Sequence, residues 1–508
     1  MRSLLKSVAI VTVFAVFERL LGFVYRVYLS RNLGAEGLAV YQIALSVIGV
    51  LVTLTASGIP ITVSRLMLKE RAQKNRLGES DVISAGIVTS LFISIPAVLA
   101  IYIFHDKVSA FFADERCFPV LAVMLPGVIL TGVYAVLRGY FWGNRFYLVY
   151  AVIEFVEELI MVATGIIIIG KCSDVFIGAK NAGIAVFVSY VASFCISTLV
   201  FVLKSGRLTN PIRKLKPLII SSSPITAMRT LTSVIGSLVA VILPSRLMFY
   251  GLDRAQALAA YGEMSGMALP LLFMPSTFIG SIALVISPEI SDSFYSGNRK
   301  KLVAAAKRAI DFSITISAVV IPFFIGCGKN IGEFIYSNAN AGKYLTFSAA
   351  IMLPMSVAMI SNSILNSVNK EKFTLICYIV SSAFMFLSIL FLPKYIGVYA
   401  LLVGYGSSYV FMSVINMLAL KKFCKNDLHY KRTLLFCAST IPPSAAFAFF
   451  LHSVLEKFLP EFFSLALSGT ACAAFTLILL CVFSVIDVRS VMGFLKELLS
   501  RRKKLSNA

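Results

Sequence analysis

Apolar blocks of about twenty residues recur along the whole chain, and this repetition restricts the fold more than any other feature of the sequence. A helix of that length spans the roughly 30 Å hydrocarbon layer of a bilayer. Only 14% of the 508 residues are charged, whereas soluble domains have about 25%. The pattern predicts an all-α polytopic membrane protein with about fourteen transmembrane helices. The predicted spans are approximately residues 7–29, 38–62, 82–104, 117–140, 147–169, 183–203, 218–249, 257–288, 303–328, 342–368, 373–393, 395–420, 433–452 and 463–486.

The positive charges are distributed unequally between the two sides of these spans. Of the 46 Lys and Arg residues, 31 fall on the side that carries both termini, 10 on the opposite side and five within spans. Short cytoplasmic loops carry such an excess, so both termini are expected to be cytoplasmic. This topology accounts for the net charge of +22, and we expect anionic membrane lipids rather than nucleic acid as the partner of the basic surfaces. The basic connections are 65–80, 204–217, 289–308 and 421–432, followed by the tail 487–508.

Two of the basic connections also mark expected domain boundaries. The sequence predicts an N-terminal six-helix lobe over 1–210, a second six-helix lobe over 211–425 and two additional helices over 426–486. Short matches between the lobes, such as SGIPITVSRL and ISPEISDSF, indicate a parallel duplication of the kind found in transporters. Apolar residues recur at helical spacing in 487–508 among lysines and arginines, which predicts a basic amphipathic helix on the cytoplasmic membrane surface.

Two arginines lie within the first predicted span. A charged side chain at the bilayer centre costs at least about 2.5–3.5 kcal/mol, so it is expected to face a watery cavity or a partner. Arg19 and Arg26 are seven residues apart, which places them on one helix face about 10 Å apart along the axis. Gly22 lies on the same stripe and leaves the backbone open. The spacing favours binding of an elongated anion such as a diphosphate, and Arg229 in the seventh span is a third candidate cation.

Five glutamates are the candidates for ion coupling or structural pairing. Glu154, Glu157 and Glu158 form one acidic face in the fifth span, while Glu18 adjoins Arg19 and Glu263 lies in the eighth span. Two interpretations remain open here. An arginine of the first span pairs with a glutamate of the fifth and joins the helices, or these charges form a site for substrate and ion.

Two further arginines within spans are expected at helix ends. Arg246 lies near the outer end of the seventh span, and Arg138 lies at the cytoplasmic end of the fourth. Long cationic side chains at such positions extend toward the interface, so we expect neither to bind a ligand.

The sequence indicates neither an enzyme nor a cofactor. The segment GCGKN at 326–330 lacks the spacing of a phosphate-binding loop, so we expect no ATP hydrolysis. Nine cysteines occur singly, without a CxxC pair, and the three histidines are far apart. We therefore expect no catalytic residue and no bound metal.

The stretches RLLGFVYR, SRNLGAEGLAVYQ, TLTASGIPITVSRL and RGYFWGN, together with LVISPEISDSFYSGNRKKL, resemble the stage V sporulation protein B group. That group is a polysaccharide-type branch of the multidrug/oligosaccharidyl-lipid/polysaccharide exporter superfamily, which also holds the lipid II flippase. The resemblance implies two six-helix lobes around a central cavity and a location in the bacterial plasma membrane. It also implies that Arg19 and Glu157 are important for function. Met161 and Met264 stand where relatives carry arginine, so identity with the housekeeping lipid II flippase is not implied.

Residues and resemblance together predict a transporter. It would flip an anionic lipid-linked oligosaccharide or peptidoglycan precursor, of the undecaprenyl-diphosphate type, from the cytoplasmic to the outer leaflet by alternating access, coupled to a proton or a sodium ion. The glutamates keep open a multidrug cation antiporter of the same architecture. A third alternative is a non-transporting scaffold for cell-wall synthesis, for which the arginines within the spans would be dispensable.

Overall fold

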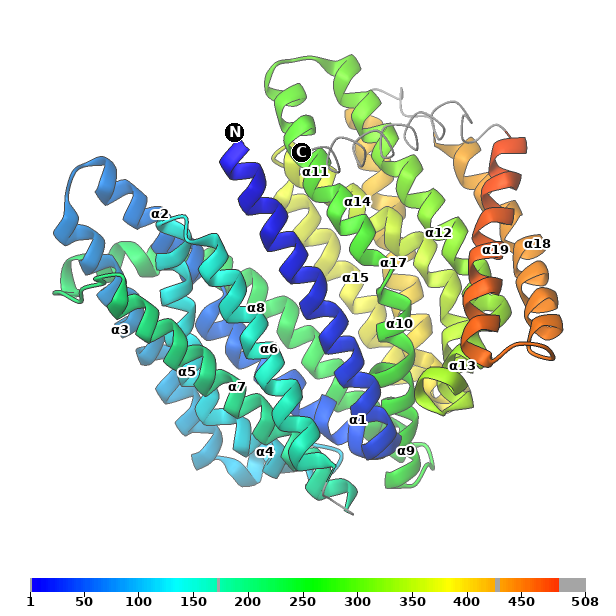
Figure 1. The fold of residues 1–508 in the computed structure, drawn as a ribbon, viewed down its shortest axis with the longest axis horizontal. Coiled ribbons are helices and arrows are strands. Elements are labelled where there is room, and N and C mark those ends of the chain that lie inside the picture. The colour runs from blue at the N-terminus through cyan, green and yellow to red at the C-terminus, as the bar shows by residue number, and fades with distance from the viewer. Residues whose placement is uncertain (1, 171–173, 425–429, 484–508) are drawn as a thin grey trace. The chain divides into compact units, whose positions relative to one another are not determined.

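The computed structural model describes residues 2–170, 174–424 and 430–483, and these residues form helices without a single strand. The chain divides into two compact units, Met1–Gly262 and Glu263–Ala508. In the first unit (Figure 1) the helices are α1 Arg2–Ala56, α2 Ile59–Ala72, α3 Arg76–Ile103, α4 His105–Phe111, α5 Cys117–Gly143, α6 Tyr147–Ile169, α7 Val175–Leu203, α8 Ile212–Phe249 and α9 Arg254–Tyr261.

The second unit begins at the second residue of a π-helix, η1 Gly262–Ala268. Its α-helices are α10 Leu269–Phe273, α11 Ser276–Tyr295, α12 Arg299–Tyr336, α13 Ala339–Ser348, α14 Met352–Ser367, α15 Glu371–Phe391, α16 Pro393–Ile396, α17 Ala400–Phe423, α18 Lys431–Leu455 and α19 Glu461–Val482, with two short 3₁₀ turns, η2 Ala349–Ile351 and η3 Gly397–Tyr399.

A single glycine divides the long helix α1 into two. Gly34 has φ 64° and ψ −175°, which is not helical. Only glycine adopts this conformation without strain, because a Cβ would be crowded by the peptide groups directly before and after it. The residues before Gly34 therefore form one helix and those after it form another. The second helix ends at Ala56, and α2 follows after the short break at Ser57 and Gly58.

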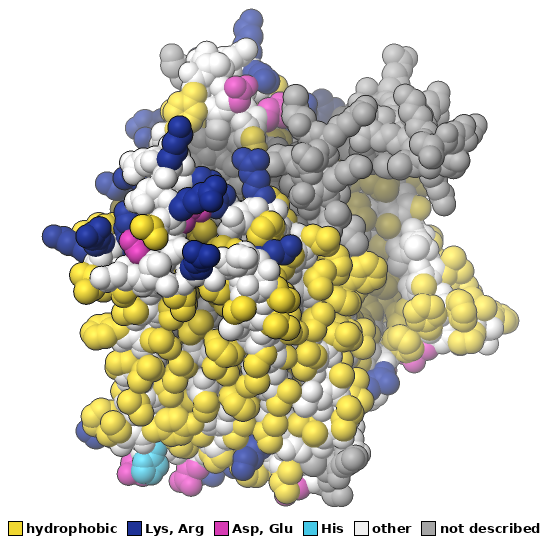
Figure 2. All heavy atoms as spheres, turned by 60° about the vertical axis from the view of Figure 1, so that its left-hand side comes forward, with side chains coloured by type: hydrophobic (Ala, Val, Ile, Leu, Met, Phe, Trp, Pro, Cys, Tyr) yellow, Lys and Arg dark blue, Asp and Glu magenta, His cyan; other side chains and the backbone are white. Residues whose placement is uncertain are grey.

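Eleven helices of the described residues are long and apolar enough to cross a membrane, or twelve if the bent pair formed by Arg254–Phe273 and Ser276–Tyr295 is one span. The segment Phe14–Ala72 is one of the eleven, although it contains the break at Gly34. Helix α6 is not among them, and it carries three glutamates. Figure 2 shows a broad hydrophobic band on the visible face, with most of the visible lysines and arginines at one end of it. The chain is thus a multi-pass helical membrane protein.

Small residues let the helices of each unit approach closely. A Cβ on Gly139 of α5 would lie 2.7 Å from the carbonyl oxygen of Pro60 in α2, and one on Gly86 of α3 would lie 2.8 Å from Val136. In the second unit, a Cβ on Gly342 of α13 would lie 2.6 Å from the carbonyl oxygen of Gly328 in α12. Such contacts are typical of helices in lipid, where association depends on close packing rather than on exclusion of water.

The boundary between the compact units follows α9 because α8 packs against α1, α2 and α3. The division into six-helix lobes over 1–210 and 211–425 stays a prediction, as does the separate pair over 426–486. The amphipathic tail predicted over 487–508 lies outside the described residues.

Candidate functional site

The first helix of α1 packs alongside α6 in the first unit. The rings of Phe14 and Phe155 meet edge to face with centroids 5.6 Å apart. The Tyr25 ring lies against Gly165, where a side chain would displace it. One turn further along, the Tyr28 hydroxyl donates a hydrogen bond of 3.2 Å to the carbonyl of Ile166. These contacts fix the rotation of α1 relative to α6. They therefore determine which side chains of α1 lie next to the glutamates of α6.

Glu158 lies against the arginine stripe of α1. A Cβ added at Gly22 would come within 2.8 Å of Glu158 Oε1, so the carboxylate occupies space that only a glycine leaves open. Gly22 lies between Arg19 and Arg26 on that stripe. Even so, neither arginine forms an ion pair within 4.0 Å among residues 2–170, 174–424 and 430–483. Arg19 is exposed and Arg26 is half-buried.

The ion pair of the acidic face joins α6 to α5 rather than to α1. Arg138 Nη1 lies 3.2 Å from Glu154 Oε1, and each side chain is 25% exposed. The guanidinium also lies 5.5 Å from the ring centroid of Trp142 and 5.9 Å from that of Tyr134, distances at which aromatic faces attract cations. We expected Arg138 to extend to the interface, but a carboxylate one helix away holds it. It is the site residue that sequence reasoning missed.

Two further acids, one on α6 and one on α1, lie near this ion pair. The Glu157 carboxylate is hydrogen-bonded to Ser193 of α7, and the charges of Glu154, Glu158 and Arg138 act on it. Glu18 of α1 is half-buried, and the charges of Glu154 and Glu158 act on it. Ionised carboxylates near one another repel, so the charges of these acids act on one another.

The arginines of α8 lie apart from this group. Arg229 is exposed, and its Nη1 donates a 3.4 Å hydrogen bond to the carbonyl of Ser57 at the break between α1 and α2. Arg246 lies in the last turn of α8, with its guanidinium 5.8 Å from the Phe249 ring centroid. The structure therefore brings Glu18, Glu154, Glu157 and Glu158 together with the α1 stripe, while Arg229 belongs to a different place on the first unit.

Glu263 belongs to the second unit and has its own partners. It is 9% exposed in the π-helix η1. Its Oε1 accepts hydrogen bonds from the side-chain amides of Asn338, at 2.9 Å, and Asn340, at 3.3 Å. Asn338 also caps α13, since its own Oδ1 accepts from the backbone N–H of Ala341. Two amides therefore orient this acid toward the start of α13.

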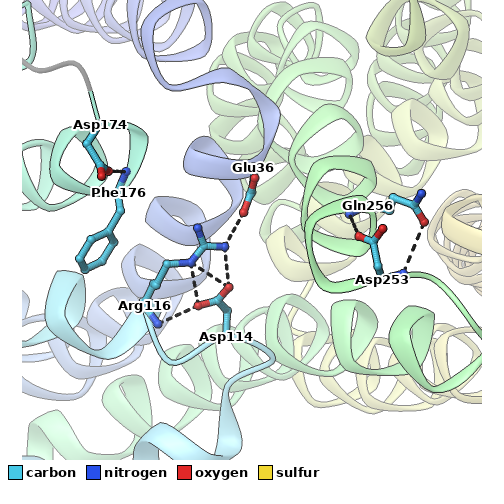
Figure 3. Close-up of polar contacts among 7 residues, drawn as sticks. All are labelled: Glu36, Asp114, Arg116, Asp174, Phe176, Asp253 and Gln256. Carbon is cyan, nitrogen blue, oxygen red and sulfur yellow. Dashed lines mark hydrogen bonds and ion pairs between the residues drawn. The ribbon is translucent and has the colours of Figure 1, made fainter.

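A charge cluster in the loops of the first unit had no counterpart in the predictions (Figure 3). Arg116 donates to both oxygens of Asp114, at 2.7 to 3.0 Å, and to Glu36 just after the break at Gly34. The Asp114 side chain is fully buried. Burial alone would raise the pKa of Asp114, but the hydrogen bonds of Arg116 and the charges of Arg116 and Arg254 outweigh it and leave this pKa below its usual range. The cluster ties the loop before α5 to the turn of α1.

The polar groups of the first unit place carboxylates beside an arginine stripe. Within the described part of the chain, no three His, Cys, Asp or Glu side chains gather at metal-binding distance. The fold and these buried charges define a multi-pass helical membrane protein with a polar interior.

The chain belongs to the polysaccharide biosynthesis protein family, whose family model matches residues 4–294. This places it among transporters rather than enzymes. It is 24% identical over 376 residues to stage V sporulation protein B of Bacillus subtilis (strain 168), covering 69% of this chain and 70% of that protein. It is 21% identical over 422 residues to the lipid II flippase MurJ of the same organism, covering 74% and 75%.

Solved transporters of one superfamily share the fold. The lipid II flippase MurJ in its inward closed conformation matches with a TM-score of 0.67 over 95% of this chain and 99% of that one, at 14% identity. A multidrug resistance MATE family transporter of the MOP superfamily, in its inward-facing conformation, matches with a TM-score of 0.66 over 80% and 94%, also at 14% identity. At such low identity the likeness shows the fold alone.

Proposed function

We propose that this transporter moves an anionic lipid-linked saccharide, of the undecaprenyl-diphosphate type, from the cytoplasmic to the outer leaflet by alternating access. One observation carries the proposal. Arg19 and Arg26 share a face of an apolar helix and form no ion pair within the part of the chain that the structure describes. Unpaired charge within a span is costly, so it indicates a ligand of opposite charge or a watery path.

Arginine suits this role better than lysine. It keeps its charge when desolvated, and its forked donors match pairs of phosphate oxygens. Two such groups about 10 Å apart along a helix can hold the two ends of a diphosphate headgroup. The family description and the names of the two Bacillus subtilis relatives favour a saccharide or peptidoglycan precursor as the cargo.

We further propose fourteen crossings with both termini in the cytoplasm. The break at Gly34 supports reading Phe14–Ala72 as two crossings. Helix α6 is long enough to cross, and its three glutamates have protein neighbours instead of lipid. With the bent pair as one further span, these additions bring the twelve candidate spans to fourteen. The basic end of the face in Figure 2 would then be cytoplasmic.

The acidic face of α6 is the proposed site of ion coupling. Glu154 is held by Arg138, which leaves Glu157 and Glu158 as the carboxylates free to bind a proton. Glu158 lies against Gly22 between the two arginines. Its protonation would remove a negative charge from the arginine stripe and strengthen the attraction of that stripe for an anion.

The test uses purified protein in liposomes with a labelled lipid-linked glycan. Arg19→Ala is expected to abolish flipping and Arg19→Lys to impair it, while Arg26→Ala follows more weakly. Arg246→Ala is the matched control, because that side chain lies beside Phe249 in the last turn of α8, and it should flip at the wild-type rate. Wild-type flipping by both alanine variants would refute the anion site and favour the scaffold alternative. Loss of the protein from the membrane would instead indicate a helix-joining role.

A multidrug cation antiporter is the second candidate, and the cluster of Glu18, Glu154, Glu157 and Glu158 favours it together with the fold shared with a multidrug transporter. The two proposals differ in the sign of the cargo. If Arg19→Ala leaves glycan flipping unaffected but Glu158→Gln abolishes export of an organic cation, the antiporter is the better account.

A further inference from the structure

A cavity of about 530 Å³ opens between α1, the start of α2, α3 and α8, entirely within the first unit. Its size falls within the range of ligand pockets, roughly 300–1,000 Å³. Leu54 and Ile59 contribute one wall, Ile93 of α3 a second, and Ala227 and Leu231 of α8 a third. None of the residues discussed above as candidate substrate or ion ligands lines it.

The cavity presents hydrocarbon, although several hydroxyl side chains line it. Ser222 and Ser223 both donate to the carbonyl of Ile219 on their own helix, at 3.3 and 2.7 Å. The hydroxyl oxygens of Thr89 and Thr230 have no hydrogen-bond partner among the described residues, but they are buried beneath the cavity surface. These groups therefore offer little to a polar ligand, and the surface favours an aliphatic chain.

A close helix contact borders this cavity near Arg229. At Gly58 a Cβ would lie 2.6 Å from the carbonyl oxygen of Ser222, so α8 seals against the break between α1 and α2. Arg229 follows the lining residue Thr226 by one turn, so it borders the cavity at the edge of the lining face of α8 without lining it. Neither Arg19 nor Arg26 lines the cavity.

A second cavity of about 310 Å³ continues along the same helix faces. It is lined by Val47 of α1, seven residues from Leu54, and by Val241 of α8. From Ile219 to Val241 the helix rises about 33 Å, which matches the hydrocarbon thickness of a bilayer. The two cavities follow one another along the seam of α1 and α8, and we call this seam the furrow.

Positive charge lies at both ends of this furrow, because Lys107 lines the second cavity and Lys216 lies at the end that we propose is cytoplasmic. Lys216 lies one turn before Ile219 on the same face of α8; it is exposed and has no ion pair in the described ranges. Lys214, two residues earlier, is already held by Glu70. We infer that the furrow binds one anionic phospholipid of the cytoplasmic leaflet, with an acyl chain in the larger cavity and the phosphate at Lys216.

The test measures retained lipid by native mass spectrometry of the purified full-length protein, in an equal mixture of phosphatidylglycerol and phosphatidylcholine. Wild type should retain one phosphatidylglycerol with about a fivefold preference, the effect of one lysine near an anionic surface. Ala227→Trp fills the cavity and should lose the lipid. Ile220→Trp is its matched control, because Ile220 is 62% exposed on the same helix and does not line the cavity.

Lys216→Gln should retain a lipid but lose the fivefold preference, whereas Lys300→Gln, an exposed lysine of the second unit, should keep it. A thermal melt checks that each variant is folded, and Leu231→Trp replaces Ala227→Trp if that protein does not fold. Equal retention by Ala227→Trp and Ile220→Trp would overturn the inference, as would an unchanged preference in Lys216→Gln. Displacement of phosphatidylglycerol by an equimolar polyprenyl phosphate would also overturn it. The furrow would then be a binding site for the lipid carrier of the substrate and not for a membrane phospholipid. None of these readouts depends on the transported substrate.

Discussion

Individual charges in the first unit differ in how completely their neighbours neutralise them. Arg138 has a carboxylate and two aromatic rings, while Arg19 and Arg26 have no ion pair among the described residues. Glu157 has a hydroxyl partner in Ser193. Removing one partner of a buried ion pair destabilises a protein because it leaves an uncompensated charge. A charge that has no protein partner is available to a ligand. The functional predictions at this scale concern the second kind.

Glu157→Gln is expected to uncouple transport from the proton gradient. The amide keeps the shape and can still bond Ser193, but it cannot carry a proton at any accessible pH. The measurement is flipping in liposomes with and without an imposed pH difference, and the variant should respond to neither sign of it. Glu333→Gln is the control, since Glu333 is 43% exposed beside Lys329. If the Glu157→Gln protein responds to the gradient as wild type does, Glu157 carries no coupling proton.

Asp114→Asn is expected to lower stability at neutral pH by about 1.5–3 kcal/mol, the value of a hydrogen bond to a charged group. The pKa of Asp114 is lowered in the folded protein, so its contribution is fully present above the unfolded value of about 3.9 and is lost as the pH falls through the lower folded value. Melting temperatures of variant and wild type should therefore differ most near pH 7 and converge in acid.

Asp106→Asn is the control for Asp114→Asn because the Asp106 side chain is 89% exposed. It should melt close to wild type at every pH. A gap between Asp114→Asn and wild type that stays constant down to pH 3 would show that Arg116 stabilises the loop without help from the charge of Asp114.

At the scale of elements, breaks in helices position the site as much as the helices do. The break at Gly34 turns α1 back, and Glu36 directly after it receives the Arg116 hydrogen bond. The break at Ser57 and Gly58 exposes the carbonyl that Arg229 contacts. Each break depends on a glycine, although for different reasons: backbone conformation at Gly34 and close approach of α8 at Gly58.

Gly34→Ala is expected to destabilise the protein by about 1–3 kcal/mol through backbone strain alone, because a Cβ there would meet no atom within 4 Å. Gly236→Ala is the matched control. It lies inside α8 with equally open space, where alanine favours the helix by roughly 0.5–1 kcal/mol. Thermal melting in detergent should shift down for the first variant and slightly up for the second. Equal shifts would mean that the turn does not require the positive φ of Gly34.

For the whole molecule, orientation in the membrane is the property that most needs a direct measurement. Single cysteines placed in a background without native cysteines can be labelled on intact cells by an impermeant thiol reagent. Asp106→Cys, between the third and fourth predicted spans, should react, and Ser296→Cys, between the eighth and ninth, should react only after the membrane is opened. Both positions are exposed, so accessibility in the protein does not limit labelling. The opposite pattern would reverse the proposed topology and the direction of transport with it.

The sequence by itself determined the properties that depend on local spacing. Apolar blocks and their lengths predicted a helical membrane protein. The spacing of Arg19, Gly22 and Arg26 placed them on one face, and that of Glu154, Glu157 and Glu158 placed them on another. Periodicity is a property of one helix, and the cost of charge in lipid is a property of one residue, so neither needs knowledge of the fold. The family resemblance, carried by short stretches of the first eight spans, was confirmed by the family model.

Only the tertiary structure decided which faces meet. The pairing of Glu154 with Arg138 instead of Arg19 depends on how α5 and α6 pack, and the seat of Glu158 against Gly22 depends on the contact of α1 with α6. Glu263 accepts hydrogen bonds from two asparagines near the start of α13. Arg116 bonds both to Asp114 and to Glu36, which lies 80 residues before Arg116 in the chain. The sequence alone does not show which cation a carboxylate will pair with, because any Lys or Arg brought close enough by the fold can form the ion pair. Close packing of small residues and rings fixes the rotation of each helix, and that rotation selects the partner.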